Sequence, residues 1–366
     1  MSSKKWSIFL LALVFVILFA IGGMTAWIDP FFHYHTPLEN LQYPINNQRY
    51  QNDGIVKHFS YDALITGTSM TENFKVSEYD ALFDVHSIKV PFSGATFTEL
   101  NQNLQRALDA NPDIKMVIYG LDSWFLLSDK DSLRTDAKYP TYLYDDDLLN
   151  DVQYLLNKEV FFSDTLGVLD YTHEDLLTTS FDDYSNWSKG YPYTAEAVVQ
   201  AYNRKPKSEE IHIMTDEERA LISYNMRNGI LEMAYSHPQI QFYYFFPPYS
   251  CLYWDDLIQL GELESQVEAF SLASELLLEA ENIHLFSFYN DYETAQNLNH
   301  YRDIVHYSED INSMILQRMK SGEYQLTKDN YQDHWQQVLT YYQGFDFDTL
   351  LSAYSGNEPT DKTTLP

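Results

Sequence analysis

Residues 61–74 have the sequence YDALITGTSMTENF, and this stretch decides the fold. The apolar run at residues 63–65 predicts a short buried strand that stops at Gly67, with Ser69 directly after it. In open α/β sheets, ligands gather outside the carboxyl ends of the strands, which is where Ser69 would lie. A plain Ser/Thr turn before a helix uses the same residue types, so Ser69 needs partners elsewhere in the chain to count as a reactive group.

A strand and helix rhythm continues from this stretch. Further apolar runs that end in small or polar residues predict four more strands, at residues 87–92, 114–119, 240–246 and 283–288. Helical spacing of apolar residues predicts crossover helices between them, for example at 96–111 and 253–280. The sequence therefore predicts a three-layer α/β/α sandwich with a five-stranded parallel sheet.

The rhythm divides the chain into four parts. We expect an anchor at residues 1–28, a membrane-proximal lead-in at 29–60, an α/β domain at 61–346 and a flexible tail at 347–366. Within the domain, residues 125–215 are rich in Tyr, Asp and Leu and lack strand rhythm, which predicts an insertion. The insertion is either a cap or groove on the ligand-binding face or an ordinary helical subdomain.

The N-terminus carries the signature of a membrane anchor. Lys4 and Lys5 precede residues 6–28, an uncharged span with a tryptophan near each end. The span is long enough to cross a bilayer, and the two lysines place the N-terminus in the cytoplasm and the body outside the cell membrane. The alternative is a signal peptide that is cleaved after Ala26.

Composition excludes several kinds of function. The chain of 366 residues has 53 acidic and 23 basic side chains and a net charge of −30. Nucleic acid is therefore not expected as a partner, and a polyanionic ligand is disfavoured unless divalent cations intervene. The sole cysteine, Cys251, excludes an internal disulfide and a cysteine-based zinc site. We expect no metal and no cofactor.

Asp303 and His306 are the candidate partners of Ser69. They lie in a loop after the last predicted strand. A nucleophilic serine needs a base within hydrogen-bond reach, and the base needs an acidic group to orient it, so one Asp-x-x-His segment can supply both. The alternative interpretation is that the two side chains cap a helix and pack the loop.

Four short motifs together resemble the SGNH, or GDSL-like, hydrolase superfamily. They are Gly67-Thr68-Ser69-Met70, Phe92-Ser93-Gly94, Gly120-Leu121-Asp122-Ser123 and Asp303-Ile304-Val305-His306. The resemblance implies a flavodoxin-like sandwich in which Ser69 is the nucleophile and Asp303 and His306 complete the triad. It also implies that the backbone N–H groups of Ser69 and Gly94 contribute to the oxyanion hole.

The third motif departs from the superfamily at Asp122. The family has an asparagine there, whose amide donates a hydrogen bond to the oxyanion. An ionised carboxylate is an acceptor only and would repel the developing negative charge. Either Asp122 is protonated, or the oxyanion hole uses only Ser69 and Gly94, or Asp122 has another part, or the protein is inactive.

Within the superfamily, the anchor and the run at residues 301–308 look most like extracytoplasmic proteins that acylate cell-surface polymers. The D-alanine transfer protein of teichoic acid and the alginate O-acetylation proteins are examples. The resemblance implies a serine acyltransferase or esterase that acts on a cell-wall or exopolysaccharide polymer. A cell-surface glycan or teichoic-acid-like polymer would be the acceptor, and a multi-pass membrane acyltransferase would be a partner.

Two other function classes remain open. The first is a catalytically inactive surface protein of the same fold that binds glycan or assists an acyltransferase complex. The second is a metal-dependent hydrolase, for which the sequence offers only scattered His and Asp residues.

Overall fold

The computed structural model describes residues 2–129, 132–134 and 139–354. The chain divides into two compact units, which are described separately. The N-terminal unit comprises Met1–Ser60, Gln102–Pro112 and Leu133–Ser185, and the sheet unit comprises Tyr61–Asn101, Asp113–Ser132 and Asn186–Pro366.

The sheet unit contains one six-stranded, mostly parallel sheet in the order β2-β1-β3-β4-β5-β6. The strands are β1 (Ala63–Thr66), β2 (Ser87–Lys89), β3 (Met116–Gly120), β4 (Gln241–Phe246), β5 (Ile283–Ser287) and β6 (Gln325–Leu326). The first five are parallel, and β6 pairs antiparallel with β5. The five predicted strands correspond to β1–β5, but the sheet has one strand more than predicted. Strand β6 has two residues, too few to show any periodicity.

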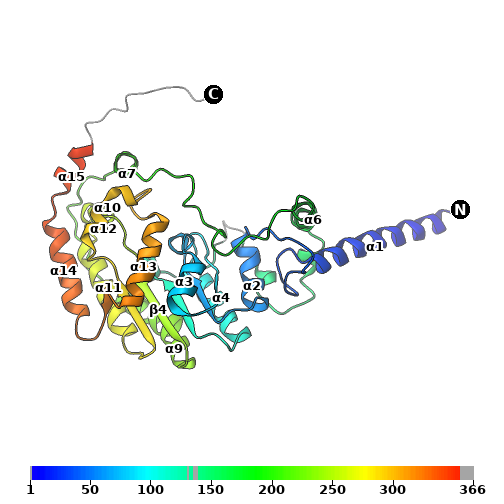
Figure 1. Ribbon diagram of the computed structural model, residues 1–366, viewed down its shortest axis with the longest axis horizontal. Coiled ribbons are helices and arrows are strands. Elements are labelled where there is room, and N and C mark those ends of the chain that lie inside the picture. Colours follow the sequence, from blue (N-terminus) through cyan, green and yellow to red (C-terminus); the bar gives the residue numbers. More distant parts are fainter. Residues whose placement is uncertain (1, 130–131, 135–138, 355–366) are drawn as a thin grey trace, which may run out of the picture. The chain divides into compact units, whose positions relative to one another are not determined.

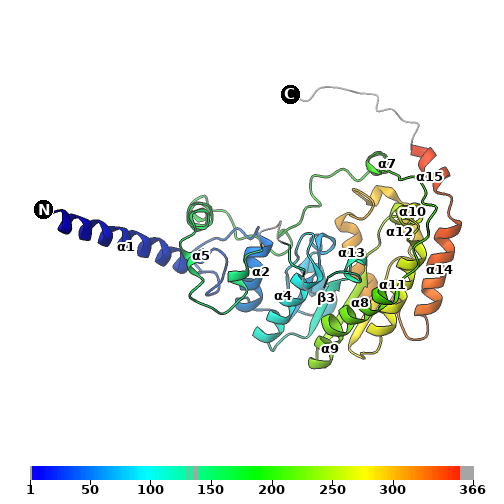
Figure 2. The same ribbon diagram turned by 180° about the vertical axis from the view of Figure 1, so that it is seen from behind.

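Helices lie on both sides of the sheet. Helices α3 and α13 pack together and stand in front in Figure 1, whereas α8 and α11 pack together and stand in front in Figure 2. The main helices of this unit are α3 (Val76–Phe83), α8 (Asp216–Met226), α9 (Glu232–Ser236), α10 (Cys251–Leu260), α11 (Leu263–Leu277), α13 (Glu309–Ser321), α14 (Tyr331–Gly344) and α15 (Phe347–Tyr354). Its shorter segments are η1 (Ser69–Thr71), η2 (Ser123–Phe125), α7 (Ala195–Ala201), η5 (Arg227–Leu231), α12 (Tyr292–Gln296) and η6 (Leu298–His300). Helix α4 (Phe97–Ala110) begins in this unit and ends in the other.

The helix predicted at 253–280 is interrupted. It divides into α10 and α11 at Gly261, whose φ of 74° is left-handed. A Cβ at this position would lie 2.2 Å from the carbonyl oxygen of Glu210, so only glycine fits there. A left-handed glycine directly after a helix is the usual way in which a helix ends, so Gly261 itself marks the break.

The structure also describes most of the predicted insertion at 125–215 and the first part of the predicted tail at 347–366. The described part of 125–215 contains only short helices and no strand. In the tail predicted at 347–366, residues Phe347–Tyr354 form α15, and residues 355–366 lie outside the described part of the chain.

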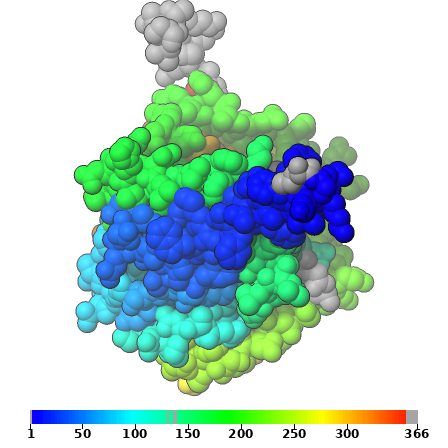
Figure 3. Space-filling view, turned by 90° about the vertical axis from the view of Figure 1, so that its right-hand side faces the viewer, coloured from blue at the N-terminus to red at the C-terminus, as the bar shows by residue number. Residues whose placement is uncertain are grey.

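The N-terminal unit begins with the apolar helix α1 (Ser3–Ile28). It has 26 residues and contains an 18-residue stretch with a mean hydropathy of 2.8, so it is long and apolar enough to cross a membrane. Most of α1 is exposed, but Gly22, Thr25 and Ile28 near its end are buried, where α1 packs against two other helical segments of this unit. In Figure 3, the dark-blue atoms of α1 lie beside the blue atoms of residues 29–60. The other helical segments are α2 (Gln48–His58), η3 (Thr141–Leu143), α5 (Val152–Leu155), η4 (Val160–Thr165) and α6 (Leu166–His173), and α1 contacts α5 and η4.

A buried carboxylate fixes the chain where it leaves α1. Asp29 is left-handed, with φ 50°, and is fully buried. Its carboxylate accepts backbone N–H groups of His33, Tyr34 and His35 at 3.0, 2.7 and 3.1 Å. It also accepts the hydroxyl of Tyr154 at 2.7 Å. One side chain thus satisfies four donors and joins the end of α1 to the rest of the unit.

Asp29→Ala should destabilise the N-terminal unit by about 3 kcal/mol, because one buried and three partly buried donors would lose their acceptor. Asp29→Asn keeps one oxygen and should cost less. The measurement is thermal unfolding of the full-length protein in detergent micelles. Equal unfolding temperatures for the wild type and Asp29→Ala would show that the carboxylate does not hold this junction.

Candidate active site

The turn that carries Ser69 depends on two glycines at neighbouring strand ends. Gly67 follows β1 with φ 147°, and a Cβ there would lie 2.6 Å from the methyl group of Thr71. Gly120 ends β3, and a Cβ there would lie 2.8 Å from the same methyl. Thr71 therefore fits between the two strand ends, and its hydroxyl donates to the carbonyl of Thr68 at 2.9 Å. The backbone N–H of Thr71 donates to the same carbonyl at 3.0 Å, so the hydroxyl reinforces the 3-10 turn η1, which begins at Ser69.

Three side chains predicted from sequence meet at this turn. The Oγ of Ser69 lies 2.9 Å from Nε2 of His306, and Nδ1 of His306 lies 2.8 Å from Oδ2 of Asp303. We refer to these three residues as the Ser–His–Asp cluster. Ser69 and His306 are both partly exposed, so the cluster is accessible to a ligand.

Local hydrogen bonds fix the acid of the cluster. Oδ1 of Asp303 accepts the backbone N–H groups of Val305 and His306 at 3.0 and 2.8 Å. Partial burial on its own would raise the pKa of Asp303, but the hydrogen bonds and charge of His306 lower that pKa below its ordinary value. Asp303 is therefore ionised at neutral pH and accepts a hydrogen bond from the Nδ1–H group of His306, which leaves Nε2 unprotonated and able to accept the Ser69 hydroxyl proton.

Trp187 contacts both Ser69 and His306. Its indole Nε1 donates to the carbonyl of Ser69 at 3.2 Å, and its ring meets the His306 ring edge to face at 5.4 Å. Its backbone N–H donates to the side chain of Asn73 at 3.1 Å. Trp187 thus holds the nucleophile turn and limits rotation of the imidazole.

Asp122 lies beneath the turn and accepts two hydroxyl groups. It is fully buried, and Thr68 Oγ1 donates to Oδ2 at 2.5 Å, while the Tyr249 hydroxyl donates to Oδ1. Burial raises the pKa of Asp122 to about 6, although both hydrogen bonds act to lower it. With both oxygens occupied as acceptors, Asp122 is placed to hold Thr68 next to Ser69, not to donate to an oxyanion. This geometry favours an oxyanion hole without Asp122.

Backbone groups near Ser69 are the remaining candidates for an oxyanion hole. The Ser69 N–H makes no hydrogen bond within the described part of the chain. Gly94, with φ 56°, lies in a turn after β2. The N–H of Phe92 donates to the Gly67 carbonyl at 2.9 Å, so this turn adjoins the strand end that leads to Ser69.

Two residues of this site were missed in the sequence. Tyr249 follows Pro247 and Pro248, which end a strand, so its place at the carboxyl edge was available as a signal. Trp187 lies in the predicted insertion, where neither spacing nor motif distinguishes it from other aromatic residues.

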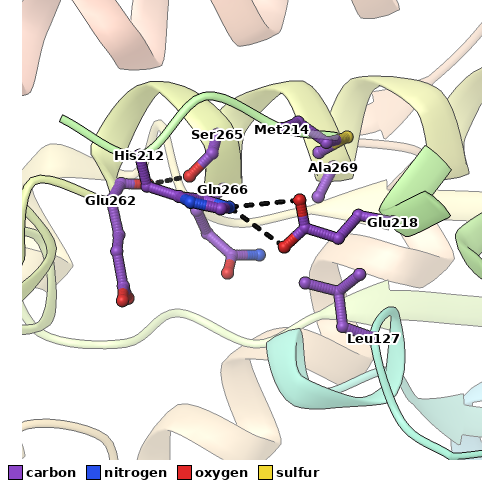
Figure 4. Close-up of a pocket in the computed structure, with 8 residues that line it drawn as sticks. All are labelled: Leu127, His212, Met214, Glu218, Glu262, Ser265, Gln266 and Ala269. Atoms are coloured by element: carbon purple, nitrogen blue, oxygen red, sulfur yellow. Dashed lines mark hydrogen bonds and ion pairs between the residues drawn. The ribbon is translucent and has the colours of Figure 1, made fainter. Parts of the chain in front are cut away.

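Two cavities of the sheet unit differ in their relation to the cluster. A cavity of about 200 Å³ is lined partly by Asp303 and Ile304 of the cluster segment. A second, of about 220 Å³, contains no residue of the cluster (Figure 4). In it, His212 pairs with Glu218 at 3.0 Å, and Glu218 also caps helix α8. Among the described residues, no group of three or more His, Cys, Asp or Glu side chains is arranged to hold a metal ion.

Comparisons with known proteins add little. No family model matches the chain, and no curated protein matches it. One similar solved structure is described as "a putative platelet activating factor from Streptococcus pneumonia". The alignment covers 75% of this chain and 90% of that chain, with 9% sequence identity and a TM-score of 0.37. A likeness at that level supports no inference about this protein.

Asp122 should make stability depend on pH. Because its folded pKa of about 6 exceeds the unfolded value of about 3.9, ionisation destabilises the folded state. The free energy of unfolding should fall by on the order of 3 kcal/mol as the pH rises from 4 to 7. Denaturant titrations of the full-length protein at several pH values measure this fall.

Asp122→Asn should lose that part of the pH dependence, whereas Asp146→Asn, at a side chain 94% exposed, should retain it. A fall of the same size in wild type and Asp122→Asn would contradict the assignment.

Proposed function

We propose that the chain is a membrane-anchored serine acyltransferase or esterase of the SGNH type that acts on acyl groups of a cell-wall or exopolysaccharide polymer. The observation that carries the proposal is the hydrogen-bonded series from Ser69 through His306 to Asp303 at the carboxyl ends of parallel strands. A partly exposed serine, an imidazole and an ionised carboxylate in this order are the parts that nucleophilic acyl transfer requires.

The proposed reaction has two halves. In the first, Nε2 of His306 takes the Ser69 proton while Oγ attacks the acyl carbonyl, and Asp303 stabilises the imidazolium. The oxyanion lies against the N–H groups of Ser69 and Gly94; when it collapses, the bond to the leaving alcohol breaks and His306 returns the proton to that alcohol. In the second half, water or a sugar hydroxyl gives its proton to His306 and attacks the acyl-enzyme. When this intermediate collapses, the bond between the acyl carbon and Ser69 Oγ breaks and His306 returns the proton to Oγ.

Asp122 bears on the rate of this reaction. Loss of one oxyanion donor costs on the order of 3–4 kcal/mol in the transition state, so a site with a carboxylate at this position is expected to be slow. Slow hydrolysis by water is compatible with a transferase, whose acceptor must compete with water for the acyl-enzyme.

The proposed setting is the outer side of the cell membrane. Helix α1 would cross the bilayer through residues 6–28, with Lys4 and Lys5 in the cytoplasm. A tethered site of this kind suits transfer from a membrane-borne donor to a surface polymer, with a multi-pass membrane acyltransferase as partner. We also propose that the six-stranded sheet and the helices on its two sides form a three-layer α/β/α sandwich of the SGNH type.

A second candidate function is a catalytically inactive glycan-binding or assembly protein. The buried carboxylate of Asp122, where an amide donor would serve the oxyanion, is the observation that favours it.

A fluorophosphonate probe distinguishes the two. With full-length protein in detergent micelles, intact and peptide mass spectrometry should show a single adduct on Ser69, absent from Ser69→Ala. In His306→Ala, the labelling rate should fall on the order of 100-fold or more, because the base is lost. The exposed His86→Ala serves as control and should label normally. A folded wild-type protein that takes no adduct would refute the catalytic proposal and favour the binding role.

A further inference from the structure

Arg302 is the basic side chain beside the Ser–His–Asp cluster. Its backbone N–H donates to the carbonyl of His306 at 2.8 Å, so the two residues are held together. Its guanidinium carbon lies 3.8 Å from the centre of the Tyr191 ring and 5.6 Å from that of Trp187. Since Trp187 also contacts the His306 ring, the guanidinium and the imidazole share one aromatic neighbour.

The charge of Arg302 has no acidic partner within the described part of the chain. Most other described arginines do pair: Arg106 with Asp53, Arg204 with Asp255, Arg219 with Glu268, Arg227 with Glu279 and Arg318 with Asp291. The carboxylates close to it in sequence have other partners, because Asp303 pairs with His306 and Glu309 lies 3.5 Å from Lys75. In a chain with 53 acidic side chains, a half-buried arginine without one is unusual.

This arrangement matches the chemistry of an anionic carbohydrate. The planar fork of a guanidinium binds carboxylate and phosphate oxygens in pairs, and stacking on aromatic rings orients the fork without neutralising it. Tyr191 is 42% exposed, so it offers apolar surface beside the charge. The combination suits a sugar or polyol unit that carries one anionic group.

We propose that Arg302, Tyr191 and Trp187 form a subsite for a carboxylate or phosphate group on the acceptor polymer, next to the hydroxyl that His306 deprotonates. This inference deepens the proposed function and depends on it for the role of His306. The subsite sets a preference that the net charge of −30 does not predict. At about 0.1 M salt, charges farther than about 10 Å away are largely screened, so Arg302 governs contact while the net charge only slows approach.

Binding to the Ser69→Ala full-length protein in detergent micelles tests the subsite without any chemistry. The probes are oligogalacturonate, its uncharged methyl ester, and a glycerol phosphate oligomer, measured by titration calorimetry. We expect one of the anionic probes to bind at least tenfold more tightly than the methyl ester. The two anionic arms distinguish carboxylate from phosphate recognition.

Arg302→Gln, added to Ser69→Ala, should abolish that tenfold preference, and Arg302→Lys should retain part of it because it keeps the charge but not the fork. Arg219→Gln removes the same charge at a paired surface site and should leave the preference unchanged. Equal loss in Arg302→Gln and Arg219→Gln, or no preference in the parent, would overturn the proposal.

The outcome is separable from that of the acyl-transfer proposal. Fluorophosphonate labelling of the wild type and of Arg302→Gln, both with Ser69 present, is measured beside the binding assay. An Arg302-dependent preference in a protein that takes no adduct would keep the subsite and refute the chemistry. Labelling that is lost in Arg302→Gln would instead show that Arg302 is required for the geometry of the cluster, and would overturn its assignment as an acceptor subsite.

Discussion

The Ser69 turn depends on two glycines, Gly67 and Gly120, at the neighbouring ends of the parallel strands β1 and β3. Strands β1 and β3 pair in register up to Thr66 and Tyr119, and the glycine that follows or ends each strand leaves room for Thr71. A larger residue at either position would displace the Thr71 side chain and with it the hydroxyl hydrogen bond that reinforces the turn. The position of Ser69 relative to His306 thus depends on a packing constraint in the sheet, not on the serine itself.

Asp122 accepts the hydrogen bonds of a buried network beneath the Ser69 turn. Thr68 and Asp122 form a hydroxyl to carboxylate pair between the ends of β1 and β3, and Tyr249 adds a donor from the end of β4. A buried carboxylate with two hydroxyl donors is satisfied as an acceptor, although its ionisation still costs free energy. Ionisation of Asp122 therefore lowers the free energy of unfolding at neutral pH, while the same carboxylate holds Thr68, the residue before Ser69.

Different features of the sequence predict the strands and the residues of the Ser–His–Asp cluster. Strands β1–β5 were predictable because buried parallel strands are continuous apolar runs, and Ser69, Asp303 and His306 because they lie where strands end and in a recognisable spacing. The two-residue β6 and the contacts of Trp187 depend on residues far away in the chain, so no local pattern encodes them. The break at Gly261 did have a local signal, because a glycine commonly ends a helix. The role of Asp122 depends on its two partners, Thr68 and Tyr249, and the sequence alone does not identify them.

The buried end of α1 has a consequence for proteolytic maturation. A protease that cleaves after Ala26 needs an extended segment of substrate, whereas the chain is helical to Ile28 and Asp29 is enclosed by four donors. Once the N-terminal unit has folded, cleavage there requires unwinding the last turn of α1 and opening that enclosure. A chain in which this unit has already folded should therefore resist cleavage after Ala26 and retain α1.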